Sequence, residues 1–170
     1  MIRAGLRLER LVPHHGIATF TSGHDDLDDW LLRHGLAAQE MDSARTFVLV
    51  GEDGVVGYFS LTMGSVRRAD APARLVRAMP AYPVGMVLLA RLAVHRLQQG
   101  EGHGALLLAE ALRKAVTAGE AAAARLVVVD AIDDRAAAFY AHHGFVATPE
   151  HPLRLHRRMK DIRASLADAR

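Results

Sequence analysis

The pattern of hydrophobic and polar positions alternates short strand-like segments with longer helical ones. Apolar and charged residues alternate over Leu6–Val12, which predicts a half-buried strand. Acidic residues crowd the start of the apolar-periodic segment Asp25–Met41, and this predicts one or two helices, because the N-terminus of a helix favours negative charge. Two β-branched and aromatic runs, Thr46–Val50 and Val55–Thr62, are separated by a polar link with two glycines, which is typical of a hairpin.

The second half of the chain predicts strands that are joined through helices. Prolines indicate a loop or short helix between Arg67 and Gly85, and the nearly continuous apolar run Met86–Val94 predicts a central strand. Helical spacing over Gly104–Ala118 predicts a long helix, with Gly119 as its stop. The next predicted elements are a strand over Leu126–Val129 and a capped helix over Asp133–His142, which Gly144 terminates. A last strand over Leu153–Met159 and a short charged helix over about 160–170 follow.

This order of elements predicts an α/β (α+β) fold with a mixed central sheet that is flanked by helices on both faces. The 170 residues suit a single core, so we expect one domain over 1–170, with a short helical C-terminal tail from about 160. The absence of cysteine excludes disulfides, thiolate metal sites and a cysteine nucleophile. No HExxH or similar ligand spacing occurs, so we expect no metal.

No signal peptide or membrane span is predicted. The first residues lack an apolar run behind their charges, and the longest apolar stretch, Val84–Val94, contains Arg91 and is too short to cross a bilayer. We therefore expect a cytoplasmic protein.

A glycine-rich loop between the central strand and the long helix carries the first indication of chemistry. Gly100, Gly102 and Gly104 alternate with other residues where the helix opens. Glycine permits positive φ, and the first N–H groups of a helix have no partner within the helix, so such a loop suits a phosphate or pyrophosphate. The spacing matches neither a Walker loop nor a dinucleotide fingerprint.

Two motifs resemble those of the GNAT acetyltransferases, whose central sheet is mixed and mostly antiparallel. Gln99-Gly100-Glu101-Gly102-His103-Gly104 resembles the Q/R-x-x-G-x-G/A acetyl-CoA motif, and Phe139–Phe145 resembles the F-Y-x-x-x-G-F element. The opening, Phe20–Gly23 followed by Leu27–Leu31, is similar to that of the GNAT toxins of type II toxin–antitoxin modules. Ser22 replaces the cysteine that is usual there.

The resemblance implies acetyl-CoA as co-substrate and direct attack by an amine, without an acyl-enzyme. Main-chain groups of Leu92, Ala93 and Val94 would hold the pantetheine arm and polarise the thioester. The pyrophosphate would bind to amides of Gln99, Gly100, Glu101, Gly102, His103 and Gly104. The match to the F-Y-x-x-x-G-F element assigns Tyr140 as general acid, and a phenol of pKa about 10 can protonate a thiolate. No residue is assigned as general base; if the acceptor is an α-amine, its pKa of about 7.7–8.0 leaves part of it neutral at physiological pH.

The distribution of charge bears on the acceptor. Six arginines and one aspartate lie between Val66 and Gln99, a local charge of +5, whereas Thr21–Asp42 carries six acids and one arginine. Arginine clusters suit phosphate backbones. In the toxins that the chain resembles, the substrate is the α-amine of aminoacyl-tRNA, and Arg33, Arg77 and Arg91 are the hypothesised tRNA contacts.

The resemblance also implies partners, and two other functions remain open. The toxins pair with a ribbon-helix-helix antitoxin, contact DNA only through that complex and often form homodimers. One alternative is a general GNAT enzyme that acts on a small-molecule amine or a protein N-terminus. The other is a non-catalytic GNAT-fold binding module, against which the intact Gln99–Gly104 loop and Tyr140 argue.

Overall fold

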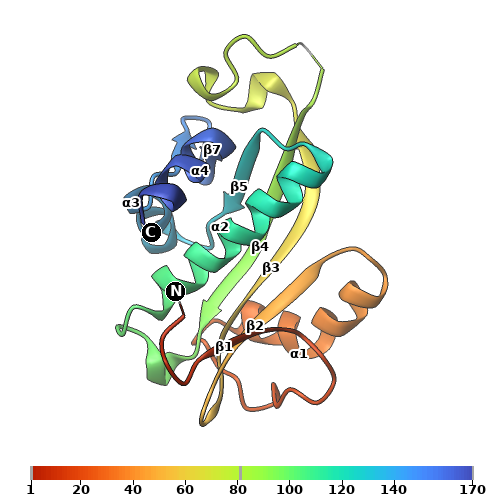
Figure 1. The fold of residues 1–170 in the computed structure, drawn as a ribbon, viewed down its shortest axis with the longest axis vertical. Coiled ribbons are helices and arrows are strands. Elements are labelled where there is room, and N and C mark those ends of the chain that lie inside the picture. Colours follow the sequence, from red (N-terminus) through yellow and green to blue (C-terminus); the bar gives the residue numbers. More distant parts are fainter. Residues whose placement is uncertain (1, 81, 170) are drawn as a thin grey trace. The chain divides into compact units, whose positions relative to one another are not determined.

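A computed structural model describes residues 2–80 and 82–169, whose strands form a seven-stranded sheet in the order β1-β2-β3-β4-β5-β7-β6 (Figure 1). The strands are β1 Arg7–Arg10, β2 Arg45–Gly51, β3 Gly54–Val66, β4 Val84–Val94, β5 Leu126–Asp130, β6 Val146–Thr148 and β7 His151–Arg158. The helices are α1 Asp25–Glu40, α2 His103–Ala122, α3 Asp134–His142 and α4 Met159–Asp168. β4 and β5 are parallel, whereas β1–β2, β2–β3, β5–β7 and β6–β7 are antiparallel. The predicted α/β class with a mixed sheet is confirmed.

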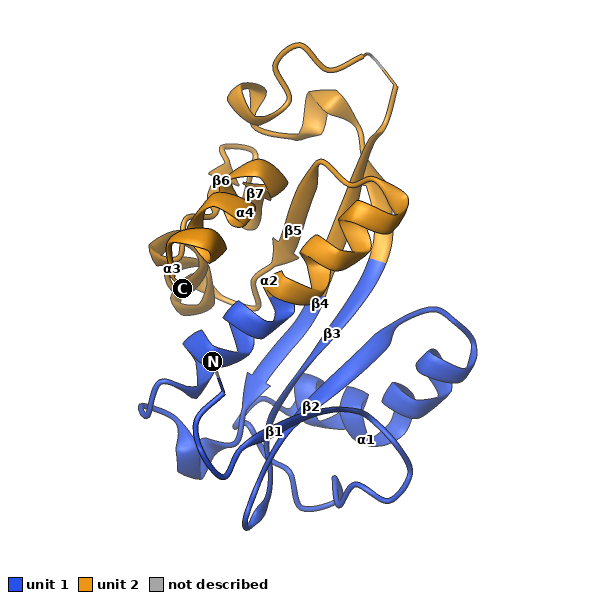
Figure 2. Cartoon of the chain, viewed as in Figure 1, with its two compact units in different colours: residues 1–62, 90–111 blue, residues 63–89, 112–170 orange. Residues whose placement is uncertain are grey.

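The first of two compact units comprises residues 1–62 and 90–111 (Figure 2). The prediction that acidic residues begin a helix in this unit is confirmed, since Asp25, Asp26 and Asp28 lie in the first turn of α1. α1 is a single helix that packs on β2. The buried core of this unit joins α1 to β2, β3 and β4, through Leu11, Phe20, Leu27, Leu31, Val48, Tyr58 and Ala93.

The second unit comprises residues 63–89 and 112–170 (Figure 2). α3 and α4 both contact β7. The proline-rich segment contains two short 3₁₀ turns, Arg68–Asp70 and Ala73–Leu75, and its apolar side chains cover strand residues. This core consists of Val66, Ala71, Leu75, Val76, Val84, Met86, Leu126 and Val128.

The prediction that Gly119 stops the long helix is wrong. α2 continues to Ala122, and the backbone turns at Ala123, whose φ is +60°. A Cβ at Gly119 would lie 2.9 Å from Cε of Met159. Gly119 therefore lies where α2 packs against the Met159 side chain at the start of α4, and it does not end the helix.

Other helix and strand boundaries differ from the predicted ones by a few residues. β3 runs on to Val66, four residues beyond its predicted end, and the short strand β6 was not placed by the sequence pattern. β7 ends at Arg158, so Met159 begins α4, in agreement with a helical tail from about 160. Asp133 caps α3 as predicted, because its carboxylate accepts a hydrogen bond of 2.8 Å from the Ala136 N–H.

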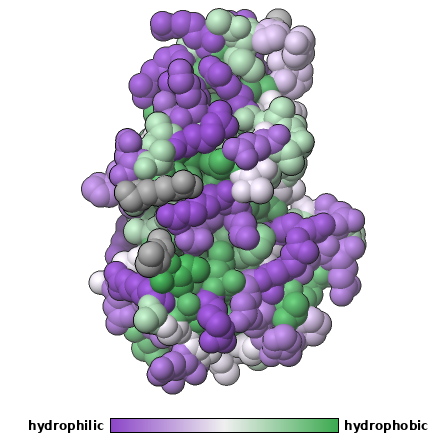
Figure 3. Space-filling model, in the orientation of Figure 1, coloured by the Kyte–Doolittle hydropathy of each residue, from purple (hydrophilic) through white to green (hydrophobic). Residues whose placement is uncertain are grey.

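No helix among the described residues is both long enough and apolar enough to cross a membrane. Polar and charged side chains cover much of the face drawn in Figure 3. A few large apolar side chains are exposed, and in the first unit these are Leu32, Met41 and Leu97. Single exposed apolar residues of this kind are ordinary on a protein surface.

The fully buried His156 on β7 makes folding stability sensitive to acid. Burial and the neighbouring charge of Arg154 lower the pKa of His156 below its ordinary value of 6.5. As the pH falls below about 6.5, the unfolded chain binds this proton before the folded chain does. We expect the free energy of unfolding to fall by up to about 1.4 kcal/mol per pH unit from this group.

Urea denaturation of the wild type and of His156→Leu between pH 7.5 and 5 checks this expectation. The variant is expected to lose less stability on acidification than the wild type. His151→Leu, at an exposed position of the same strand, is the matched control and should keep the wild-type slope. Equal slopes for the wild type and His156→Leu would contradict the assignment.

Candidate active site

The glycine loop opens directly into the long helix of the first unit. After β4, a 3₁₀ turn over Arg96–Gln98 leads into the loop, and α2 begins at His103, one residue before its predicted start. Gly100 has φ +83° and Gly102 has φ +85°, a region that side chains other than glycine rarely adopt. The first turn of α2 contains no acidic residue. The loop thus presents main-chain N–H groups at a helix N-terminus, which suits a phosphate group.

The side chain of Gln99 holds the loop in place instead of facing a ligand. Its Nε2 donates hydrogen bonds to the carbonyl oxygens of Ser22 at 2.8 Å and Val94 at 3.0 Å. Ser22 is 3% exposed, and its own Oγ donates to the Asp28 carboxylate at 2.7 Å. The motif glutamine thus ties the end of β4 to the residues that precede α1. No local pattern predicts this contact, because Gln99 and Ser22 are 77 residues apart.

The segment Leu92–Val94 offers main-chain groups along one edge of β4. The parallel register pairs Met86–Leu89 with Leu126–Val129, and β5 ends at Asp130. In this register the described strands leave Leu92–Val94 beyond the end of β5, so N–H and C=O groups on that edge are available to a ligand. β3 passes very close on the other side: a Cβ at Gly57 would lie 2.7 Å from the Ala93 carbonyl oxygen.

Tyr140 lies in the second unit, near the end of α3, and is 5% exposed. Its ring packs edge-to-face against Phe139 and Phe145, with centroids 5.2 and 5.7 Å apart. Burial raises the pKa of Tyr140 well above its ordinary value of 10. The hydroxyl therefore stays protonated near neutral pH, as a proton donor requires.

The other two tyrosines are unsuited to that role. The hydroxyl of Tyr58 is buried and donates a hydrogen bond of 2.6 Å to the Leu27 carbonyl oxygen. Tyr82 is 69% exposed. Tyr140 alone among the three combines a buried ring with the motif position that the sequence pointed to.

The three arginines predicted to contact RNA have different surroundings. Arg91 is half-buried, and its guanidinium carbon lies 4.2 Å from the centroid of the Trp30 ring. Arg33, on α1, lies 4.0 Å from the Asp29 carboxylate and is largely exposed. Arg77 is exposed in the second unit, in the arginine-rich segment after β3. The structure thus brings Arg91 against α1, whereas Arg77 belongs to the other unit.

Arg91 has an unusual electrostatic environment. Burial lowers the pKa of its guanidinium, and no carboxylate among the described residues forms an ion pair with it. Stacking on Trp30 satisfies one face of the guanidinium but leaves its N–H donors without an anion. A partly buried, unpaired guanidinium is suited to a phosphate or carboxylate of a ligand.

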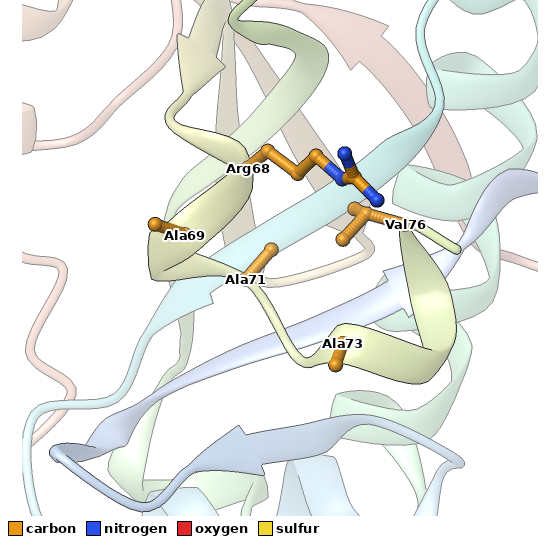
Figure 4. Close-up of a pocket in the computed structure, with 5 residues that line it drawn as sticks. All are labelled: Arg68, Ala69, Ala71, Ala73 and Val76. Carbon is orange, nitrogen blue, oxygen red and sulfur yellow. The ribbon is translucent and has the colours of Figure 1, made fainter. Parts of the chain in front are cut away.

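Two hollows in the second unit adjoin the arginine-rich segment. One, of about 440 Å³, is lined by Arg68, Ala69, Ala71, Ala73 and Val76 (Figure 4), and its walls are mostly small apolar side chains. The other, of about 560 Å³, contains two arginine–carboxylate pairs, Arg67–Asp70 at 2.6 Å and Arg154–Asp130 at 2.7 Å. Both carboxylates therefore already have a charged partner.

The histidines near the predicted motifs do not supply an obvious base. His142 is exposed at the end of α3, whereas burial and the charges of His142 and Arg157 lower the pKa of His143. His103 is 9% exposed, and its Nε2 lies 3.1 Å from a carboxylate oxygen of Glu101. His103 therefore packs into the loop and does not project from it.

A further cluster, formed by Glu9, His14 and His15, brings its potential ligand atoms within 4.8 Å of one another. The Nδ1 of His15 accepts a hydrogen bond of 3.0 Å from the Val12 N–H. The Nε2 therefore carries the proton, which it donates to Glu9 at 2.8 Å. A metal on Nε2 would have to displace that proton, so hydrogen bonding accounts for the cluster.

Comparison with known proteins identifies the family. Residues 42–147 match the acetyltransferase (GNAT) domain. The chain belongs to the GNAT acetyltransferase family. This GNAT enzyme is 43% identical to a tRNA-acetylating toxin of Mycobacterium tuberculosis over 152 residues, which cover 89% of this chain and 91% of the relative.

Two solved structures of the toxin AtaT share the fold of this GNAT enzyme. AtaT in complex with acetyl-methionyl-tRNAfMet has a TM-score of 0.86 and 26% identity, over 95% of this chain and 99% of that chain. The second is a tyrosine-to-phenylalanine mutant of AtaT that is bound both to the C-terminus of the antitoxin AtaR and to acetyl-CoA. It has a TM-score of 0.82 and 26% identity, over 95% of this chain and 98% of that chain. The predicted resemblance to GNAT toxins is confirmed, and the chain is an acetyl-CoA-dependent N-acetyltransferase.

Proposed function

We propose that this GNAT enzyme is a toxin that acetylates the α-amine of aminoacyl-tRNA and so blocks translation. The observation that carries the proposal is the 43% identity to a tRNA-acetylating toxin over nearly the whole length of both chains. The AtaT complex with acetyl-methionyl-tRNAfMet supports the same substrate class. A function in translation would place the enzyme in the cytoplasm.

The residues of the first unit fit acetyl-CoA. In our proposal, main-chain groups of Leu92, Ala93 and Val94 bind the pantetheine arm and orient the thioester. The N–H groups of Gln99–Gly104 bind the pyrophosphate, because two left-handed glycines and a helix start free of acids present donors there. Acetyl-CoA supplies the thioester whose acetyl group the amine receives.

Tyr140 is proposed as the general acid. Its hydroxyl would donate the Oη proton to sulfur as the carbon–sulfur bond breaks, and the proton that the amine nitrogen loses on forming the amide would restore the phenol. Burial raises the pKa of this phenol, so the hydroxyl would keep its proton until the thiolate forms. An aminoacyl α-amine, with a pKa of about 7.7–8.0, is partly neutral at physiological pH and can attack without a dedicated base.

Arg33, Arg77 and Arg91 are proposed to contact the tRNA backbone. The unpaired guanidinium of Arg91, stacked on Trp30 and one residue before the thioester-binding segment, is the most specific of the three. Arg33 and Arg77 are exposed and can reach phosphates as flexible cations.

Replacing Arg77 and Arg91 with alanine is expected to raise KM for aminoacyl-tRNA by about tenfold or more, because each removes a phosphate contact. The Kd of acetyl-CoA should stay unchanged. Steady-state kinetics with purified aminoacyl-tRNA, together with calorimetry for acetyl-CoA, measure the two effects. Arg10→Ala, an exposed arginine on β1, is the matched control, and equal losses for both ligands would contradict the RNA-binding role.

We also propose a ribbon-helix-helix antitoxin as partner and a homodimer as the free form. The AtaT structure bound to the C-terminus of its antitoxin supports an antitoxin partner for this chain. In this proposal the antitoxin supplies the DNA contact of the complex.

Incubation with labelled acetyl-CoA, charged total tRNA and a panel of small amines tests the proposed function. Label is expected on the charged tRNA and not on uncharged tRNA. Label that appears only on small amines would overturn the toxin assignment and favour a general GNAT enzyme.

A further inference from the structure

A residue far from the loop in sequence supplies the phosphate loop with a cation. Nη1 of Arg3 donates a hydrogen bond of 3.1 Å to the main-chain oxygen of Glu101, across 98 residues of sequence. Its Nη2 lies 3.3 Å from the position that a Cβ of Gly102 would occupy. Figure 1 shows the segment that precedes β1 beside the start of α2. The guanidinium therefore lies against the two central residues of the loop.

The loop needs a cation from elsewhere if it is to bind phosphate tightly. Residues 99–104 contain no lysine or arginine, and Glu101 contributes a negative charge. The Glu101 carboxylate is 60% exposed, with His103 Nε2 at 3.1 Å. An exposed carboxylate repels a phosphate group nearby, and the positive charge of Arg3 offsets this repulsion.

The backbone before β1 fixes the position of Arg3. Gly5 has φ +85°, and the Leu6 N–H donates a hydrogen bond of 3.1 Å to the Arg3 carbonyl oxygen. This turn directs the segment back toward the loop. Within the described residues, Arg3 forms no ion pair, and its bond to Glu101 uses one of five N–H donors. Its remaining donors are available to an anion.

We propose that Arg3 is a cofactor-binding residue that contacts a phosphate group of acetyl-CoA at the loop Gln99–Gly104. The phosphate is either the pyrophosphate or the 3′-phosphate of the ribose, and both would receive charge-assisted hydrogen bonds from the guanidinium. The inference rests on the use of acetyl-CoA and not on tRNA as the acceptor. The proposed toxin function and the role of Arg3 can therefore fail independently.

Binding of four ligands to Arg3→Ala tests the proposal: acetyl-CoA, acetyl-dephospho-CoA, S-acetyl-4′-phosphopantetheine and S-acetylpantetheine. We expect Arg3→Ala to bind acetyl-CoA about tenfold more weakly than the wild type, and S-acetylpantetheine equally well. If Arg3 contacts the 3′-phosphate, Arg3→Ala and the wild type should bind acetyl-dephospho-CoA equally well. If Arg3 contacts the pyrophosphate, Arg3→Ala should bind acetyl-dephospho-CoA more weakly than the wild type does.

The salt dependence separates direct contact from a purely structural role of Arg3. Loss of a phosphate contact lowers the slope of log Kd against log salt, whereas a distorted loop leaves that slope unchanged. Arg3→Lys should restore part of the affinity, because the charge returns without the fork of donors. Arg10→Ala is the matched control, and thermal melting confirms that each variant folds.

Wild-type affinity of Arg3→Ala for acetyl-CoA would overturn the proposal. A loss of affinity with an unchanged salt slope would overturn it as well. Neither result depends on the acceptor, because only binding of acetyl-CoA and its fragments is measured.

Discussion

Replacing Tyr140 with phenylalanine is expected to lower kcat about 100-fold or more and to leave the Kd of acetyl-CoA unchanged. General acid catalysis typically raises the reaction rate by about 10²–10⁴-fold. Phenylalanine removes the hydroxyl group with its proton but keeps the aromatic ring. The ring packs against Phe139 and Phe145, so the core of the second unit should be preserved. Single-turnover kinetics and calorimetric titration with acetyl-CoA measure the two quantities.

Tyr82→Phe is the matched control for this experiment, because Tyr82 is 69% exposed and lies outside the motif. It should retain the activity of the wild type. If Tyr140→Phe turns over at the wild-type rate, Tyr140 has no part in proton transfer and its hydroxyl is a core feature only.

Gly57→Ala is expected to destabilise the protein by about 2–3 kcal/mol and to weaken acetyl-CoA binding. A Cβ at this position would lie 2.5 Å from Leu107 Cδ1 and 2.7 Å from the Ala93 carbonyl oxygen. The main-chain oxygen cannot turn away as a side chain does, so β3 must move from the segment Leu92–Val94. Such a loss corresponds to a fall in Tm of roughly 5–10 °C for a chain of this length.

Gly16→Ala provides the comparison, because a Cβ at Gly16 meets no atom within 4 Å and its φ is not positive. Its Tm and acetyl-CoA affinity should match those of the wild type. A Gly57→Ala variant with unchanged Tm would contradict the close approach of β3 and β4 at this point.

Local chemistry explains why the glycine loop and the capped start of α3 could be predicted. Positive φ at Gly100 and Gly102 and the Asp133 cap depend on residues that are neighbours in sequence. The end of α2 could not be predicted in this way. Gly119 resembles a local stop signal, but its role is set by Met159, 40 residues further along, and the helix ends instead at a left-handed alanine.

Contacts between distant parts of the chain also decide what the motif residues do. The sequence indicated that Gln99 and Arg91 belong to the functional region. It could not indicate that the Gln99 side chain binds the Ser22 and Val94 carbonyls, or that Arg91 stacks on Trp30. Arg3 belongs to none of the sequence motifs, and its contact with Glu101 is visible only in the fold.

Mass spectrometry of the acceptor end of tRNA determines whether the enzyme acetylates the aminoacyl α-amine. Charged tRNA is incubated with the enzyme and acetyl-CoA, then digested with nuclease, and the terminal aminoacyl-adenosine is analysed. We expect an acetyl group on the α-nitrogen of the aminoacyl moiety, and none on tRNA charged with the corresponding α-hydroxy acid. Unmodified aminoacyl-adenosine, under conditions in which the enzyme consumes acetyl-CoA with another amine, would contradict this expectation.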